Sequence, residues 1–202
     1  MRYPDTWRKA EGIFKEHGGM LRTSHAIALG VHPRVLYNMS DAGRLKRVSR
    51  GLYRLADLPE LGNPDLASVA ARMPHGVICL ISALAYHGIT TQIPHQVDVA
   101  VPRGTKQPRI QFPPIRVFRF STAMHKAGAE THLVDNIEVR VYNAAKTVAD
   151  CFRFRNRIGI DVVVEALKLF RERKSASVQE LLKYARLCRV ERVVMPYLEA
   201  LQ

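Results

Sequence analysis

The chain has 202 residues, a length that suits one large domain or two small ones, and 47% of them are hydrophobic, enough to build buried cores. Its formal net charge is +13, which favours a polyanionic partner. Residues 1–58 carry a charge of +6, residues 59–142 carry +2 and residues 143–202 carry +5. The excess is therefore concentrated towards the two ends of the chain.

Three features of the composition exclude other classes of protein. The three cysteines are far apart and form no Cys-x-x-Cys pair, which argues against a disulfide framework and a zinc ribbon. The first twelve residues are charged and lack the apolar core of a signal peptide. The longest apolar run, Val77 to Tyr86, is about half of the roughly 20 residues that a membrane span needs. We therefore expect a cytoplasmic protein without membrane contact.

The stretch from Met20 to Leu55 predicts a helix-turn-helix followed by a basic two-stranded wing. Ala26 is small enough for a second helix to cross the first closely, and Gly30 suits the tight turn between the two helices. Pro33 fits the first turn of the second helix, where its missing N–H group costs nothing. Thr23 or Ser24 is expected to cap the first helix of the motif. The free backbone N–H groups at this helix end would also favour a bound phosphate.

The second helix of this motif, roughly Pro33 to Ala42, is predicted to have two distinct faces. Val35, Leu36, Met39 and Ala42 recur at helical spacing and should pack inward. Arg34, Tyr37 and Asn38 lie on the other face. Arginine and asparagine read guanine and adenine edges in the major groove, so this face is the expected reader of DNA sequence.

The predicted wing consists of Leu45–Ser49 and Leu52–Leu55, joined by a turn at Arg50-Gly51. Its cations suit a hairpin lying along phosphates. An exposed helical hairpin beside a solvated basic turn is the plainer alternative. The residues expected to contact DNA are Thr23, Ser24, Arg34, Tyr37, Asn38, Arg44, Lys46, Arg47, Ser49, Arg50, Tyr53 and Arg54.

The rest of the chain predicts an α+β protein in which the N-terminal winged helix-turn-helix precedes a mixed α/β domain with a helical C-terminal tail. A first helix over Asp5–Glu16 completes the N-terminal core. The Pro/Gly/Asn-rich stretch Asp57–Pro64 is the expected boundary between domains 1–58 and 59–202. Helices are expected after the caps Asn63, Asn143 and Ser177 and from Asp161 and Val190. Alternating strands are expected at Gln96–Val101, Ile115–Phe120 and Ile137–Tyr142.

The order of these segments resembles the AbiEi antitoxin family of transcriptional regulators of viral defence. The resemblance covers about residues 8–195. Its most telling segments are Ser82–Gly88, with the sequence SALAYHG, and Lys146–Asp150, with the sequence KTVAD. RGLYRL closes the wing, and VDVAVPRG precedes the strand-to-helix segment IEVRVYNAAKTVADCF.

This resemblance implies a non-enzymatic role in abortive infection, a phage defence. The winged helix would bind inverted repeats in double-stranded operator DNA and repress its own type IV toxin–antitoxin operon. The C-terminal part would neutralise an AbiEii-like nucleotidyltransferase toxin without a stable complex. No cofactor or metal is implied. A regulator that acts alone, without a toxin partner, stays open as an alternative.

A nuclease is the rival interpretation, because a basic α/β domain after a DNA-binding module is a common nuclease plan. Asp98 and Glu138 lie on predicted strands, but no strand carries a Glu-x-Lys pattern. The histidine spacings fit no zinc signature, and His87 is expected to end a helix instead.

Two groups in the C-terminal part are further candidates. Lys146 and Asp150, one helical turn apart, are expected to form a surface ion pair worth about 0.3–0.5 kcal/mol. Basic clusters could form a second anionic-ligand surface, with RNA as a candidate partner, or be solvated helix ends. They consist of Arg153, Arg155, Arg157, Arg171, Arg173 and Lys174.

Overall fold

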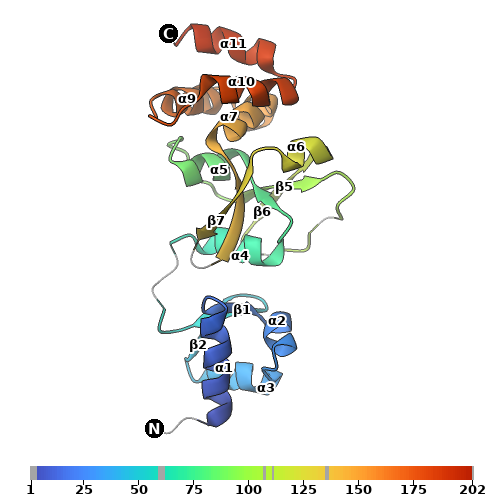
Figure 1. The fold of residues 1–202 in the computed structure, drawn as a ribbon, viewed down its shortest axis with the longest axis vertical. Coiled ribbons are helices and arrows are strands. Elements are labelled where there is room, and N and C mark those ends of the chain that lie inside the picture. Colours follow the sequence, from blue (N-terminus) through green and yellow to red (C-terminus); the bar gives the residue numbers. More distant parts are fainter. Residues whose placement is uncertain (1–3, 59–61, 107, 111, 135–136, 202) are drawn as a thin grey trace. The chain divides into compact units, whose positions relative to one another are not determined.

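The computed structural model describes residues 4–58, 62–106, 108–110, 112–134 and 137–201. Contacts divide the chain into two units (Figure 1). Unit 1 comprises residues 1–74 and 132–139, and unit 2 comprises residues 75–131 and 140–202. The fold is mixed α and β with a helical C-terminal part, as the sequence predicts.

Unit 1 contains helices on a small three-stranded antiparallel sheet with the strand order β1-β3-β2. The helix α1 coincides with the predicted range. Met20–Arg22, which was not predicted to be a strand, pairs with β3 and makes β3 the central strand. The elements are α1 (Asp5–Glu16), β1 (Met20–Arg22), α2 (Thr23–Ala28), α3 (Pro33–Asp41), β2 (Leu45–Ser49), β3 (Leu52–Leu55) and α4 (Pro64–Arg72).

The core of unit 1 forms where the apolar faces of its helices meet the sheet. Phe14 of α1, Ala26 of α2 and Leu36 and Met39 of α3 are 0% exposed. These burials fit the predicted anchors, whereas Ala42 ends α3 as an exposed residue. The helix α4 contacts β2, and the contacts of the chain divide it after Pro74.

A second sheet has five strands in the order β6-β5-β4-β8-β7 and belongs mostly to unit 2, although His132–Val134 of β7 and Ile137–Val139 of β8 are assigned to unit 1. The strand β5 is parallel to β6 and antiparallel to β4, and β4 is parallel to β8. The strand β7 and the short helix α6 were not predicted. The elements up to the last strand are β4 (Val77–Ile78), α5 (Leu80–His87), β5 (Val97–Pro102), β6 (Ile115–Phe120), α6 (Thr122–Lys126), β7 (Ala129–Val134) and β8 (Ile137–Tyr142).

The strand β5 differs from its predicted half-buried character, because Asp98 and Ala100 are as buried as Val97, Val99 and Val101. Successive side chains of a strand point to opposite faces, so both faces of β5 are covered, and the helices α5 and α6 contact this strand. A strand covered on both faces need not alternate in hydrophobicity. Asp98, polar in sequence, is accommodated there by an ion pair with Arg116.

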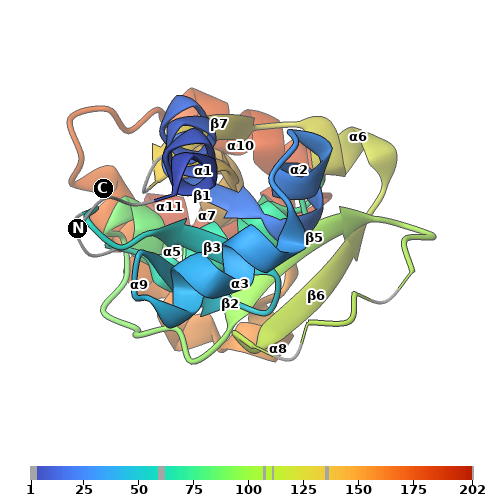
Figure 2. The same ribbon diagram turned by 90° about the horizontal axis from the view of Figure 1, so that it is seen from below.

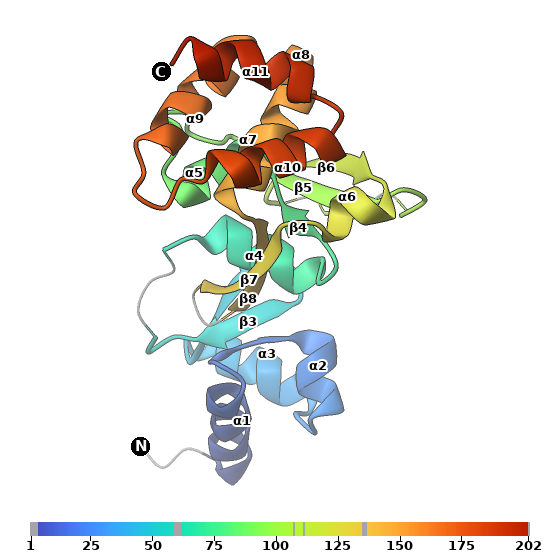
Figure 3. The same cartoon turned by 45° about the horizontal axis from the view of Figure 1, so that its top comes forward.

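The C-terminal helices pack around α7, which contacts α5, α9, α10 and α11 (Figure 3). All eight residues from Ala145 to Phe152 are buried. The cysteines Cys79, Cys151 and Cys188 are buried free thiols in unit 2. The helices are α7 (Ala144–Arg153), α8 (Arg155–Ile158), α9 (Ile160–Arg171), α10 (Val178–Leu187) and α11 (Glu191–Glu199).

Candidate nucleic-acid interface

The candidate interface in unit 1 is centred on α3, which follows α2 after a short turn (Figure 2). Gly30, in the turn, adopts a φ of +92°, a conformation that favours glycine. The next residue, Val31, donates its N–H to the carbonyl of Ala26 at 2.9 Å and is itself buried. The turn is thus fixed against the first helix by a backbone bond and a core side chain.

The start of α3 is capped by His32, a residue that the sequence did not single out. Its Nδ1 accepts a hydrogen bond from the backbone N–H of Arg34 at 3.2 Å. Pro33 occupies the first turn, as predicted. A histidine is not among the preferred capping residues, so no standard signal marks this cap.

The outward face of α3 presents Arg34, Tyr37 and Asn38, all three exposed, as the helical spacing predicts. The Tyr37 side chain is 53% exposed. Leu36 and Met39 on the opposite face are fully buried, so the helix is held rigidly while its polar face stays accessible. Such a face can insert side chains into a groove of matching width.

The hairpin of β2 and β3 carries three exposed cations, Lys46, Arg47 and Arg50. The guanidinium Nε of Arg47 donates to the carbonyl of Ser49 at 3.4 Å, and Ser49 itself is half-buried. The cations therefore lie on the accessible part of the hairpin, where phosphates can reach them.

Three expected DNA-contact residues have internal roles instead. Arg44 donates to Glu11 through both Nε and Nη2, at 3.1 and 2.7 Å, and so joins the end of α3 to α1. Tyr53 and Arg54 are only 6% and 5% exposed. Tyr53 belongs to the core that the helices of unit 1 form against the sheet, and Arg54, the next residue of β3, is buried as well, so neither side chain is open to solvent as expected.

The prediction that Thr23 or Ser24 caps α2 is wrong. Arg22 precedes the first turn of this helix, and no side chain caps it. Thr23 instead donates its backbone N–H to the carbonyl of Gly51 at 2.9 Å. Ser24 is exposed in the first turn of α2. The capping prediction failed because the unpredicted strand β1 runs directly into α2.

The basic clusters of unit 2 largely bind backbone carbonyls of their own unit. Four of the five arginines donate through Nη1 to carbonyls near the ends of helices, where carbonyls lack helical partners. The bonds are Arg153 to Cys188, Arg155 to Phe152, Arg171 to Leu198 and Leu201, and Arg173 to His87. The guanidinium of Arg157 lies 4.6 Å from the centroid of the Phe118 ring, and Lys174 is exposed.

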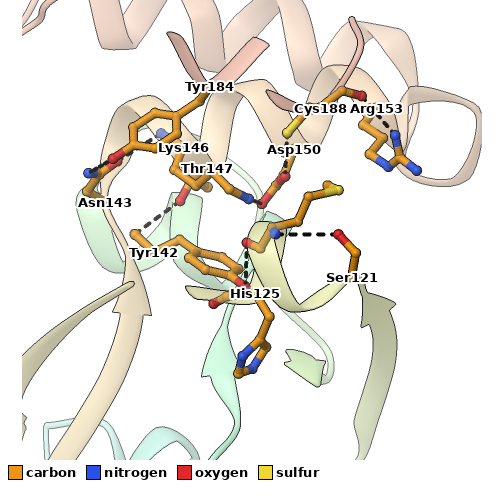
Figure 4. Close-up of polar contacts among 11 residues, drawn as sticks. Ser121, His125, Tyr142, Asn143, Lys146, Thr147, Asp150, Arg153, Tyr184 and Cys188 are labelled. Carbon is orange, nitrogen blue, oxygen red and sulfur yellow. Dashed lines mark hydrogen bonds and ion pairs between the residues drawn. The ribbon is translucent and has the colours of Figure 1, made fainter. Parts of the chain in front are cut away.

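Lys146 and Asp150 are a buried pair, not the expected surface pair. Both side chains are 0% exposed, and the ammonium donates to Asp150 Oδ2 (Figure 4). The ammonium also lies 4.3 Å from the centroid of the Tyr142 ring and 5.0 Å from that of Phe120. Helical spacing predicts that the two side chains meet, but it does not predict that this face of α7 is covered.

Further contacts join this pair to α10. The Cys188 thiol donates to Asp150 Oδ1 at 3.2 Å, and burial raises the pKa of this thiol to about 12, so it stays protonated. Burial also raises the pKa of Asp150, while the neighbouring Lys146 ammonium opposes that rise. Asn143 caps α7 by accepting from the Lys146 N–H at 2.8 Å, as predicted, and donates to the Tyr184 hydroxyl at 3.1 Å. The cluster therefore fastens α7 to α10 from inside the protein.

The acidic residue and the histidine considered for nuclease or metal chemistry both have internal partners. Asp98 is bound by Arg116 through two hydrogen bonds of 2.8 and 2.9 Å. Burial raises the pKa of Asp98, although Arg116 counteracts it. His87 is the last residue of α5, as predicted, and its Nε2 lies 2.7 Å from the carbonyl oxygen of Tyr142. Over the described ranges, no group of three histidine, cysteine or acidic residues could hold a metal ion.

Comparisons with known proteins agree with this picture. Residues 13–56 match the family model described as "Transcriptional regulator, AbiEi antitoxin", which confirms the resemblance from the last turn of α1 to the end of β3. That family is one of regulators, not a class of enzymes. No curated protein matches the chain. The crystal structure of the RV2827C protein from Mycobacterium tuberculosis is similar, with a TM-score of 0.57 and 14% identity over 98% of this chain and 82% of that chain. At this identity the likeness concerns the fold alone.

In the described part of the chain, no helix is both long enough and apolar enough to cross a membrane.

Proposed function

We propose that unit 1 is a winged helix-turn-helix that binds double-stranded operator DNA containing inverted repeats. The observation that carries the proposal is the rigid placement of α3, with Arg34, Tyr37 and Asn38 exposed over buried Leu36 and Met39. The basic hairpin of β2 and β3 is the wing. The family match over the same residues supports this assignment.

The two parts of the interface have different roles in this proposal. Arg34 and Asn38 lie one turn apart on α3 and read bases in the major groove. Lys46, Arg47 and Arg50 contact phosphates or the minor groove and hold the protein in register. In this proposal Arg44, Tyr53 and Arg54 do not contact DNA directly. They support the contacting residues from within unit 1.

Salt-titrated fluorescence anisotropy on operator and scrambled duplexes tests this division. Arg34→Ala or Asn38→Ala should weaken operator binding by about 1–3 kcal/mol and relax base preference. Lys46→Ala should weaken binding to both duplexes similarly and lower the salt slope by about 1. Asp41→Ala, on the same exposed face of α3, removes a negative charge; as the control it should strengthen binding to both duplexes and leave the operator-to-scrambled ratio unchanged. An unchanged operator-to-scrambled ratio in both α3 variants would show that this helix is not the reader.

We further propose that the protein is the antitoxin of an AbiEii-like nucleotidyltransferase toxin, autorepressing a phage-defence operon through unit 1 and neutralising the toxin through unit 2. The family description supports a regulator and antitoxin in general. Growth of cells that express a neighbouring nucleotidyltransferase gene, with and without this chain, tests the antitoxin role. Operator repression without rescue would favour a regulator that acts alone.

A further inference from the structure

An open groove in unit 2 runs along α9. Its volume is about 660 Å³, within the usual range of sites that hold a ligand or part of a partner. Thr91, in the segment after α5, and Tyr197 of α11 line this α9 groove together with α9 itself. The α9 residues of the lining recur at spacings of three or four, so they share one stripe of the helix. They are Asp161, Val164, Glu165, Lys168, Leu169 and Glu172.

The apolar part of the α9 groove remains partly open to solvent. Ile160, which lines the groove at the start of α9, is 42% exposed. Val164, Leu169 and Tyr197 are only half-buried, whereas Leu167, on the face of α9 towards the core, is fully buried. A groove that leaves aliphatic and aromatic side chains accessible is typical of a surface that takes up the apolar face of a partner.

The charge of the α9 groove is opposite to that of the unit around it. Unit 2 contains 19 Lys/Arg and nine Asp/Glu, but the groove is lined by three carboxylates and a single ammonium group, that of Lys168. Lys168 lies three residues after Glu165 and four before Glu172, within helical reach of both. Among the described residues, however, it forms an ion pair with neither. The groove therefore offers its carboxylates to a cation from outside the chain.

Two of these carboxylates have surroundings that keep them charged or that gain nothing from their charge. Glu165 accepts hydrogen bonds from the hydroxyl groups of Thr91 and Thr90, at 2.6 and 3.0 Å. These bonds, that from Thr91 above all, lower the pKa of Glu165, so it is ionised at neutral pH. Glu172 ends α9, where the helix dipole disfavours a negative charge. The charge of Glu172 therefore does not stabilise the helix that carries it.

We propose that the α9 groove binds an amphipathic basic helix of a partner protein. The apolar side chains of such a helix would pack against the open aliphatic residues of the groove, and its Lys or Arg residues would face the carboxylates. Along α9, Asp161 and Glu165 are about 6 Å apart, and Glu165 and Glu172 about 10 Å. A helix with cations four and seven residues apart, in either direction, matches this spacing. The whole stripe extends over about 16 Å, which suits a chain segment better than a small organic cation.

The net charge of the protein makes a peptide test selective. A chain with a net charge of +13 repels a cationic peptide, so general electrostatic attraction would not hold the peptide to the surface. The probes are fluorescein-labelled helical peptides of about 16 residues. They carry leucines on one face and lysines at the matching spacing, with one peptide for each direction. Anisotropy with the full chain should show binding by at least one of them that weakens as salt is added.

Two control peptides separate the contributions of charge and of the apolar face. A peptide with glutamates in place of the lysines, and one with serines in place of the leucines, should both bind much more weakly than the basic peptide. Binding of the basic peptide that is no tighter than that of the acidic one would overturn the proposal. Equal binding of the serine peptide would show charge attraction alone and would overturn it as well.

Neutral variants test whether the carboxylates of the groove hold the peptide. Asp161→Asn combined with Glu172→Gln removes two exposed negative charges and should weaken binding by about threefold or more. Glu180→Gln combined with Glu191→Gln, on α10 and α11 and outside the groove lining, is the charge-matched control and should have a smaller effect. Equal losses in the two double variants would place the peptide elsewhere.

Single substitutions test the apolar contact and the direction of the charge effect. Ile160→Ala should weaken binding, whereas Leu187→Ala, which removes a side chain 37% exposed on α10, should not. Glu172→Lys should weaken binding of the basic peptide and favour a peptide whose matching lysine is replaced by glutamate. Circular dichroism checks that each variant is folded. Displacement of the peptide by spermidine at equal concentration would show a site for small cations and would overturn the proposal. Because operator binding and toxin rescue are measured separately, failure here leaves the proposed function untouched.

Discussion

The buried Lys146–Asp150 pair allows a sharp test of what holds unit 2 together. Lys146→Met keeps the length of the side chain but leaves the buried Asp150 carboxylate without the ammonium, while its hydrogen bond from the Cys188 thiol remains. Removing one partner of a buried pair costs about 3–5 kcal/mol, whereas an exposed helical pair is worth about 0.3–0.5 kcal/mol. Because both side chains are 0% exposed, we expect the larger figure.

The double variant Lys146→Met/Asp150→Asn distinguishes loss of the pair from simple damage to packing. The neutral amide introduced by Asp150→Asn can still accept from Cys188, and the methionine introduced by Lys146→Met can pack against Tyr142 and Phe120. The double variant should therefore be more stable than Lys146→Met alone by about 2 kcal/mol or more. Urea unfolding followed by far-UV circular dichroism measures these differences. Additive losses in the two single variants and the double variant would refute the reasoning.

The pH dependence of Lys146→Met is a second check on the same argument. Burial already raises the pKa of Asp150, and removal of the ammonium takes away the charge that opposes this rise. A carboxyl group whose folded-state pKa lies above its unfolded value destabilises the fold as the pH rises through that window. The deficit of Lys146→Met relative to the wild-type protein should therefore shrink as the pH falls towards about 4, by roughly 1.4 kcal/mol per pH unit at most.

Three further outcomes can be measured. Gly128→Ala places a Cβ 2.7 Å from the Cβ of Lys146 at a φ of +69°. Gly88→Ala meets only the backbone strain of its φ of +64°, about 1–2 kcal/mol. In thermal melts Gly128→Ala should therefore lower stability more than Gly88→Ala. Burial lowers the pKa of His125, and Arg140 and Lys146 add to this effect. The free energy of unfolding should therefore fall as the pH drops from about 7 to about 5, by at most about 1.4 kcal/mol per pH unit. His125→Gln should flatten this pH dependence, whereas the control His95→Gln should not. Plasmid and RNA incubated with the purified protein in Mg²⁺ or Mn²⁺ should stay intact, and cleavage abolished by Asp98→Ala would contradict a purely regulatory role.

The sequence predicts unit 1 well, because its signals are local. Helical periodicity identifies the buried residues Leu36 and Met39, and the Arg50-Gly51 turn identifies the hairpin. The strand β1 has only three residues, too few for a period to be recognised. The burial of Tyr53 and Arg54 could not be predicted either, because it depends on which distant segments pack over the faces of the sheet.

Unit 2 shows the same limit more strongly. The caps Asn143 and Ser177 and the buried stripe of α9 follow from the sequence. The burial of Lys146 does not, because charge and spacing are the same for an exposed pair. Likewise, the sequence does not show that Arg153 binds a carbonyl 35 residues away. From the sequence alone, its guanidinium would be expected to be accessible to an anionic ligand.

The distribution of two residue types between the units provides internal reporters. Trp7, the single tryptophan, packs against the core of unit 1, whereas all three thiols are buried in unit 2. Tryptophan fluorescence, excited at a wavelength that tyrosine does not absorb, therefore follows the unfolding of unit 1. The rate at which a thiol reagent labels the cysteines follows the opening of unit 2. The unmodified protein can thus reveal whether operator DNA stabilises one unit or both. A ligand that stabilises only unit 1 would shift the fluorescence transition and leave the rate of thiol labelling unchanged.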